Sequence, residues 1–76
     1  MKIKTAKGIE LECDSVTSIP SPMRLYLHLL DIGAEAAAEI FGDRTQLPIE
    51  GYPLYTVLQN VSPEGPTRAK VSLKGK

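Results

Sequence analysis

The chain has 76 residues, which is enough for one small domain and close to the lower limit for a hydrophobic core that folds on its own. Nine lysine and arginine residues balance nine aspartate and glutamate residues, so net charge gives no general attraction to nucleic acid or to an anionic membrane. The single cysteine excludes an internal disulfide, and no apolar run reaches the ~18 residues of a membrane-spanning helix. We therefore expect one domain over residues 1–76, made and folded in the cytoplasm.

The first predicted element is a β-hairpin over residues 2–13. We expect a three-residue loop at residues 6–8, with Gly8 in the left-handed conformation that only glycine adopts without a steric cost. The resulting pairs are Thr5 with Ile9, Lys4 with Glu10, Ile3 with Leu11 and Lys2 with Glu12. One face of this hairpin is apolar and the other carries pairs of opposite charge, so a slip of one residue would break both patterns.

Residues 14–22 contain three serines, one threonine and two prolines, a composition that predicts a loop. Residues 23–30 then alternate between apolar and mostly polar side chains, which predicts a strand. The residues expected to face the core are Met23, Leu25, Leu27 and Leu29. A helix is the alternative for this segment, because leucine and methionine are good helix formers.

Residues 33–42 read GAEAAAEIFG and form the segment with the strongest helix propensity. We expect Asp31 to cap its start and Gly42 to follow its end. The stripe expected to face the sheet consists of Ile32, Ala36 and Ile40, with Ala37 and Phe41 beside it. A helix of about ten residues is marginal in water by itself, so we expect it to dock on one face of a sheet.

The C-terminal half is predicted to be mostly strand. Residues 45–50 alternate, and Pro48 places this short strand at a sheet edge. Residues 54–61 are apolar on both faces, as in a central strand; residues 62–66 are expected to form a loop, and 67–73 a last strand. The order is β-β-β-α-(β)-β-β: an α+β fold with a small, mostly antiparallel sheet, or a partly open barrel, of five or six strands and one short helix.

Residues with catalytic or metal-binding chemistry are sparse. His28 is the only histidine, and as a strand residue opposite the leucines it is expected to face solvent rather than act as a general base. Cys13 is expected to be a small core residue rather than a reactive thiol. One histidine and one cysteine do not make a metal site, and no phosphate-binding or hydrolase motif is present. We expect no enzyme activity, no cofactor, no metal and no small-molecule substrate.

Two groups of residues are candidates for binding. If the outer faces of their strands align, Tyr26, His28, Tyr55 and Val57 form an amphipathic patch that suits a protein partner or self-association. The alternative is that they form a second small core beneath residues 14–22.

The second group is basic. If the first and last strands are neighbours, the cluster consists of Lys2, Lys4, Arg68, Lys70 and Lys74. It predicts a nucleic-acid-binding module as the alternative function. Lysines on edge strands also protect a sheet from aggregation, which is the simpler interpretation of the same residues.

Several short motifs resemble a group of small phage and prophage proteins encoded near phage structural genes. The matching residues are Glu12-Cys13-Asp14 after the hairpin, Phe41, Asp43 and Thr45, then Gly51, Tyr52, Tyr55 and Leu58, and finally Ala69, Val71 and Leu73. The resemblance implies a prophage or virion-associated protein and assigns no site. Together with the composition, it favours a non-enzymatic interaction or structural module within a larger assembly.

Overall fold

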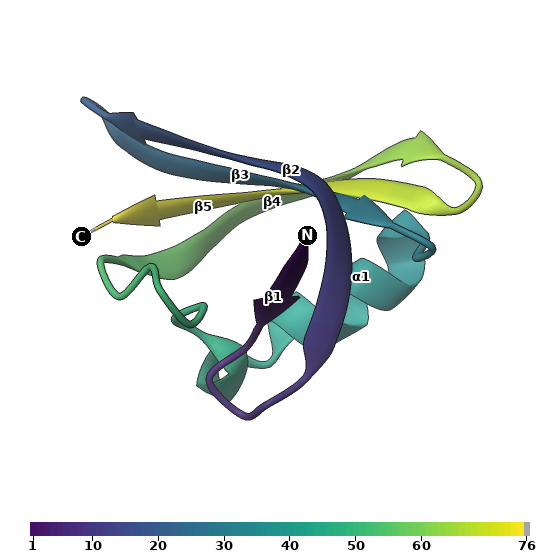
Figure 1. The fold of residues 1–76 in the computed structure, drawn as a ribbon, viewed down its shortest axis with the longest axis horizontal. Helices are drawn as coiled ribbons and strands as arrows, with labels where there is room; N and C mark the ends of the chain where they lie inside the picture. Colours follow the sequence, from purple (N-terminus) through teal and green to yellow (C-terminus); the bar gives the residue numbers. More distant parts are fainter. Residues whose placement is uncertain (76) are drawn as a thin grey trace.

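The computed structural model describes residues 1–75, which contain five strands, one α-helix and one 3-10 helix (Figure 1). In chain order the elements are β1 (Lys2–Lys4), β2 (Glu10–Pro20), β3 (Met23–Leu30), α1 (Ala34–Gly42), η1 (Arg44–Gln46), β4 (Tyr55–Gly65) and β5 (Arg68–Gly75). The strands form one open sheet in the order β1-β2-β3-β5-β4, and every neighbouring pair is antiparallel. This confirms the predicted α+β fold.

The N-terminal hairpin has the predicted register. The paired residues are Lys2 with Glu12, Ile3 with Leu11 and Lys4 with Glu10. Its loop is closed by a hydrogen bond from the Thr5 N–H to the Ile9 carbonyl and another from the Gly8 N–H to the Thr5 carbonyl, each 2.9 Å. Gly8 has a φ of +92°, so a glycine is required where the pattern predicted one.

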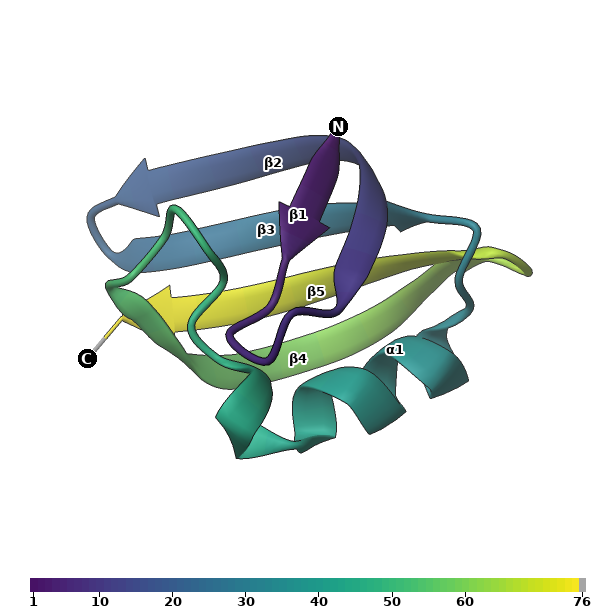
Figure 2. The ribbon, with the colours of Figure 1, turned by 60° about the horizontal axis from the view of Figure 1, so that its bottom comes forward.

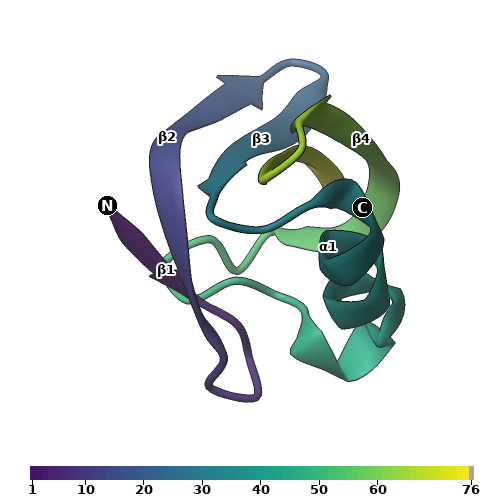
Figure 3. The ribbon, with the colours of Figure 1, turned by 90° about the vertical axis from the view of Figure 1, so that its right-hand side faces the viewer.

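The prediction of a loop over residues 14–22 is wrong, because β2 continues to Pro20. Only residues 21–22 connect it to β3. A bulge between Cys13 and Ser15 interrupts the ladder, and β2 bends from β1 at one end to β3 at the other (Figure 3). The β-branched residues after the bulge suit a strand, and pairing with β3 overrides the loop preference of the serines.

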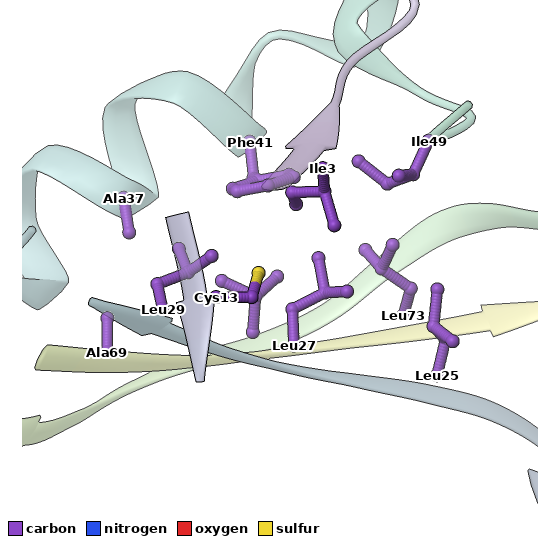
Figure 4. Close-up of a cluster of buried hydrophobic side chains, with 11 residues drawn as sticks. Ile3, Cys13, Leu25, Leu27, Leu29, Ala37, Phe41, Ile49, Ala69 and Leu73 are labelled. Carbon is purple, nitrogen blue, oxygen red and sulfur yellow. The ribbon is translucent and has the colours of Figure 1, made fainter. Parts of the chain in front are cut away.

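The core lies between α1 and the face of the sheet that α1 covers, here called the inner face (Figure 4). The strand residues on this face pair as Leu25 with Leu73, Leu27 with Val71 and Leu29 with Ala69, and all six are buried. From the helix, Ala37 and Phe41 are buried against them, whereas Ala36 is exposed. Leu25, Leu27 and Leu29 thus face the core as predicted, whereas Met23 is not part of the buried core, and the buried stripe of the helix is rotated from the expected one.

The helix is close to its predicted range of 33–42, but both predicted caps are wrong. The N-cap residue is Gly33, which has no side chain to offer, and Asp31 lies before it with a positive φ of 59°. Gly42 is the last helical residue, and Asp43 is the C-cap. With its N-terminal N–H groups uncapped by a side chain, the helix depends mainly on packing against β4 and β5 (Figure 2).

The short strand predicted over residues 45–50 is replaced by η1 and an isolated bridge between Ile49 and Tyr52. The cause is local: the Asp43 carboxylate accepts hydrogen bonds from the Thr45 N–H at 3.0 Å and the Thr45 hydroxyl at 2.6 Å, which stabilises a tight turn. This segment runs beside the N-terminal hairpin.

The assignment of residues 54–61 as a central strand is also wrong. β4 is an edge strand, because β5 inserts between β3 and β4. β4 also extends through residues 62–65, which were predicted as loop, and pairs with β5 up to Gly65. Tyr55, Leu58 and Val61 pack against the core, while three bulges interrupt the pairing of β4 with β5.

Candidate interaction surface

The face of the sheet opposite α1, here called the outer face, is not covered by the helix (Figure 3). Alternation along β3 and β5 places on it the side chains that do not enter the core. The paired residues are Arg24 with Lys74, Tyr26 with Ser72, His28 with Lys70 and Leu30 with Arg68. Neighbouring strands add Ser15, Thr17 and Ile19 from β2, and Val57, Asn60 and Ser62 from β4. The outer face therefore presents a regular array of mostly polar groups.

Positive charge is concentrated on this face. β3 and β5 contribute four cations to it, Arg24, Arg68, Lys70 and Lys74, and none of the four forms an ion pair with a carboxylate of residues 1–75. One carboxylate that reaches the face, Glu64, contacts His28 instead. Elsewhere the cations are partly neutralised, as in the pairs of Lys2 with Glu10 at 3.9 Å and of Lys7 with Asp43 at 3.7 Å. A chain with no net charge thus carries a basic surface.

Tyr26 and Lys70 form the centre of the outer face. The Lys70 ammonium lies 4.8 Å from the centroid of the Tyr26 ring, a cation–π contact. The contact holds a half-buried cation in place and occupies part of the ring that would otherwise be open to a ligand. A ring engaged in this way offers less free area for stacking a base.

His28 is half-buried, and its Nδ1 lies 3.1 and 3.3 Å from the two carboxylate oxygens of Glu64. The partner comes from the end of β4, 36 residues later in the chain. This contact fixes the imidazole against the sheet. Sequence reasoning missed Glu64, because the segment that contains it was assigned to a loop.

Tyr55 does not join the predicted patch. Tyr26, His28 and Val57 share the outer face, whereas Tyr55 packs against the core from the inner face. Its ring meets Tyr52 edge-on, with the centroids 6.5 Å apart and the planes at 61°. A bulge between Tyr55 and Val57 reverses the alternation that would have put both residues on one face.

The predicted basic cluster does not form as a single group. β1 and β5 are separated by β2 and β3, so Lys2 and Lys4 lie on a different part of the surface from the three cations of β5. Arg24 of β3 takes their place, because it lies directly opposite Lys74. The sequence signal for Arg24 was its position in the alternating strand, on the same face as Tyr26 and His28.

Cys13 is buried, as expected, with 1% of its surface exposed. Burial raises the pKa of its thiol from 9.0 to about 11, so the thiol is protonated at neutral pH. Within residues 1–75, no three histidine, cysteine, aspartate or glutamate side chains are grouped closely enough to hold a metal ion.

Two hollows lie away from the centre of the outer face. One, of about 330 Å³, is formed around β1 and Tyr52; the other, of about 470 Å³, lies between Phe41, Leu47 and the start of β4. Neither is lined by Tyr26, His28 or Lys70. These two hollows are therefore not part of the centre of the candidate surface.

Over the part of the chain that the structure describes, no helix is long and apolar enough to cross a membrane. Comparison of the chain with protein-family models, with curated proteins and with solved structures finds no match.

Proposed function

We propose that this protein is a non-enzymatic interaction module and that the outer face of its sheet binds an acidic surface of a protein partner. The observation that carries the proposal is the segregation of charge: four cations on one sheet face have no carboxylate partner among residues 1–75. A basic patch around an aromatic residue supplies both orientation and contact area for an acidic partner. The resemblance of this chain to phage and prophage proteins supports the further proposal that the protein works in a phage-derived assembly, in the cytoplasm or in a virion.

An acidic protein surface is favoured over nucleic acid for two reasons. Single-stranded nucleic acids bind to aromatic rings on which bases stack, and the outer face has one such ring, already in contact with Lys70. The second tyrosine predicted for this surface, Tyr55, packs against the core. Four cations on one face nevertheless suit a phosphate backbone, so a nucleic-acid-binding module remains the second candidate.

The experiment compares two anionic probes, poly-L-glutamate and oligothymidylate, by calorimetric titration at low and high salt. We expect the polypeptide to bind more tightly, with an affinity that falls as salt rises. Tighter binding of oligothymidylate, with a log–log salt slope of roughly −0.7 per phosphate contacted, would favour the second candidate. Absence of binding to either probe would contradict both.

Matched charge-reversal variants test whether the probe binds to the outer face. The double variant R24E/K74E reverses two charges on the outer face, and K2E/K4E makes the same charge change on β1. We expect the first to abolish binding and the second to reduce it only slightly. Equal losses would show that overall charge, rather than the outer face, is responsible.

A further inference from the structure

The sheet has one long edge with which no strand among residues 1–75 pairs. β1 pairs with β2 only at residues 10–12, and the Cys13 N–H bonds to the Met1 carbonyl just beyond them. From Ser15 to Ile19, β2 pairs with β3 on one side, and no other strand pairs with it on the opposite side. In Figure 2 this part of β2 forms the border of the sheet. Its outward backbone N–H and C=O groups are a template for another strand.

The other edges of the sheet are protected. At β4, three bulges and Pro63 interrupt the regular ladder geometry that a further strand needs. The free side of β1 is covered by the chain that follows η1. There, the Glu50 N–H donates to the Lys4 carbonyl at 2.8 Å, and the Ala6 N–H donates to the Gln46 carbonyl at 2.9 Å.

Residues 15–19 of β2 have none of these protections. Their sequence, Ser-Val-Thr-Ser-Ile, contains no charge, no proline and no glycine, and three of its five residues are β-branched. The bulge ends this regular stretch on one side and Pro20 ends it on the other. The result is a regularly paired, uncharged segment of five residues, which is the usual length of a pairing strand.

We propose that the protein forms a two-fold symmetric dimer by antiparallel pairing of β2 with β2 of a second copy, centred on Thr17. The strand that pairs with this edge comes from a second copy of the chain, because the segment is self-complementary. With Thr17 opposite its own equivalent, Val16 lies opposite Ser18 and Ser15 opposite Ile19 of the partner chain. Asp14 then lies opposite Pro20 rather than another Asp14, so no like charges meet.

The pairing joins the two sheets into one and makes their outer faces continuous. The proposal does not depend on what the outer face binds, because dimer formation is measured without any ligand. The test of dimerisation and the test of ligand binding can therefore give negative results independently of each other.

The first test is the mass of the chain in solution, measured by analytical ultracentrifugation over a range of concentrations. We expect a reversible approach to twice the chain mass of 8.3 kDa. A monomer at every concentration, up to the highest that can be reached, would overturn the proposal.

Matched lysine variants locate the interface. Thr17 and Thr56 are both exposed threonines, one on the proposed interface of β2 and one on the edge strand β4. T17K places two lysines opposite each other across the symmetry axis and should weaken the dimer by about tenfold or more. T56K should leave it unchanged. A dimer that T17K does not weaken, or that T56K weakens equally, would overturn the assignment to β2.

Cysteine substitutions test the register without depending on affinity. T17C should form an intermolecular disulfide under mild oxidation, because the two residues face each other across the axis. S15C alone should cross-link poorly, whereas a mixture of S15C and I19C should form the mixed disulfide. The native Cys13 is buried and serves as the internal control for thiol access. Efficient cross-linking of S15C to itself, with none for T17C, would contradict the proposed register.

Discussion

The hydroxyl of Thr5 donates a hydrogen bond of 2.6 Å to the side-chain carbonyl oxygen of Gln46, 41 residues away, and both residues are buried. The same Thr5 oxygen accepts a hydrogen bond from the Ile9 N–H at 3.1 Å. This polar contact ties the loop of the N-terminal hairpin to η1. It therefore links the first and middle thirds of the chain.

Replacing Thr5 with valine should destabilise the protein by about 1–3 kcal/mol, because it leaves the Gln46 carbonyl oxygen and the Ile9 N–H without their partner. Gln46→Leu should cost a similar amount. The double variant should cost less than the two single variants combined, since both polar groups are then removed together. Urea unfolding of the unmodified protein, the two single variants and the double variant gives the coupling free energy between Thr5 and Gln46. Strictly additive losses of unfolding free energy would show that the hydrogen bond contributes nothing.

Substitutions at two glycines distinguish the effect of backbone strain on stability from the effect of packing, because both glycines have open space around them. A Cβ at Gly8 or at Gly42 would meet nothing within 4 Å, but only Gly8 has a positive φ, of +92°. Gly8→Val should therefore destabilise the fold by about 1–2 kcal/mol through backbone strain. Gly42→Ala, at the end of α1, should stabilise it by about 0.5–1 kcal/mol. Thermal unfolding measures both, and an unchanged midpoint for Gly8→Val would contradict the assigned turn.

The Cys13 thiol should be unreactive in the folded protein. Burial raises its pKa to about 11, so little thiolate is present at neutral pH. The folded pKa lies above the unfolded value, so the associated stability is fully present below pH 9 and is lost as pH rises towards 11. Ellman's reagent should react slowly with the native protein and rapidly in denaturant. Fast labelling under native conditions would show that the thiol is accessible.

The pKa of Asp43 should lie below its ordinary value. The main cause is the hydrogen bonding from the side chain and backbone of Thr45, and the Lys7 ammonium at 3.7 Å contributes less. Because the folded pKa is lowered, the stability is present above the unfolded pKa and is lost as pH falls through the folded pKa. A titration followed by NMR should show that Thr45→Ala raises the Asp43 pKa more than Lys7→Ala does. The opposite order would mean that the ion pair dominates.

Local sequence patterns predicted the structural features that depend on residues close together in the chain. The register of the first hairpin follows from Gly8 and the charge pairs, and the inward leucines of β3 follow from alternation. The ends of β2 and β4 could not be predicted in this way. Their serines, prolines and glycines favour loops locally, and it is pairing with β3 and β5 that makes them strands.

Only part of the candidate surface was predicted from the sequence. Tyr26 and His28 were correctly placed opposite the core, but the insertion of β5 between β3 and β4 is a long-range feature that no local pattern encodes. That insertion brings Lys70 over Tyr26 and leaves Lys2 and Lys4 elsewhere. Tyr55 was misplaced because a bulge changes which way a strand residue faces, and bulges leave little trace in a sequence.

NMR mapping tests most directly whether the outer face of the sheet is the binding surface. The ¹⁵N-labelled protein is titrated with poly-L-glutamate at low salt. We expect the largest chemical-shift changes at the backbone amides of Arg24, Tyr26, Lys70 and Lys74, with little change at Lys2 and Lys4. Changes centred on β1 or α1, with the amides of β3 and β5 unaffected, would contradict this expectation.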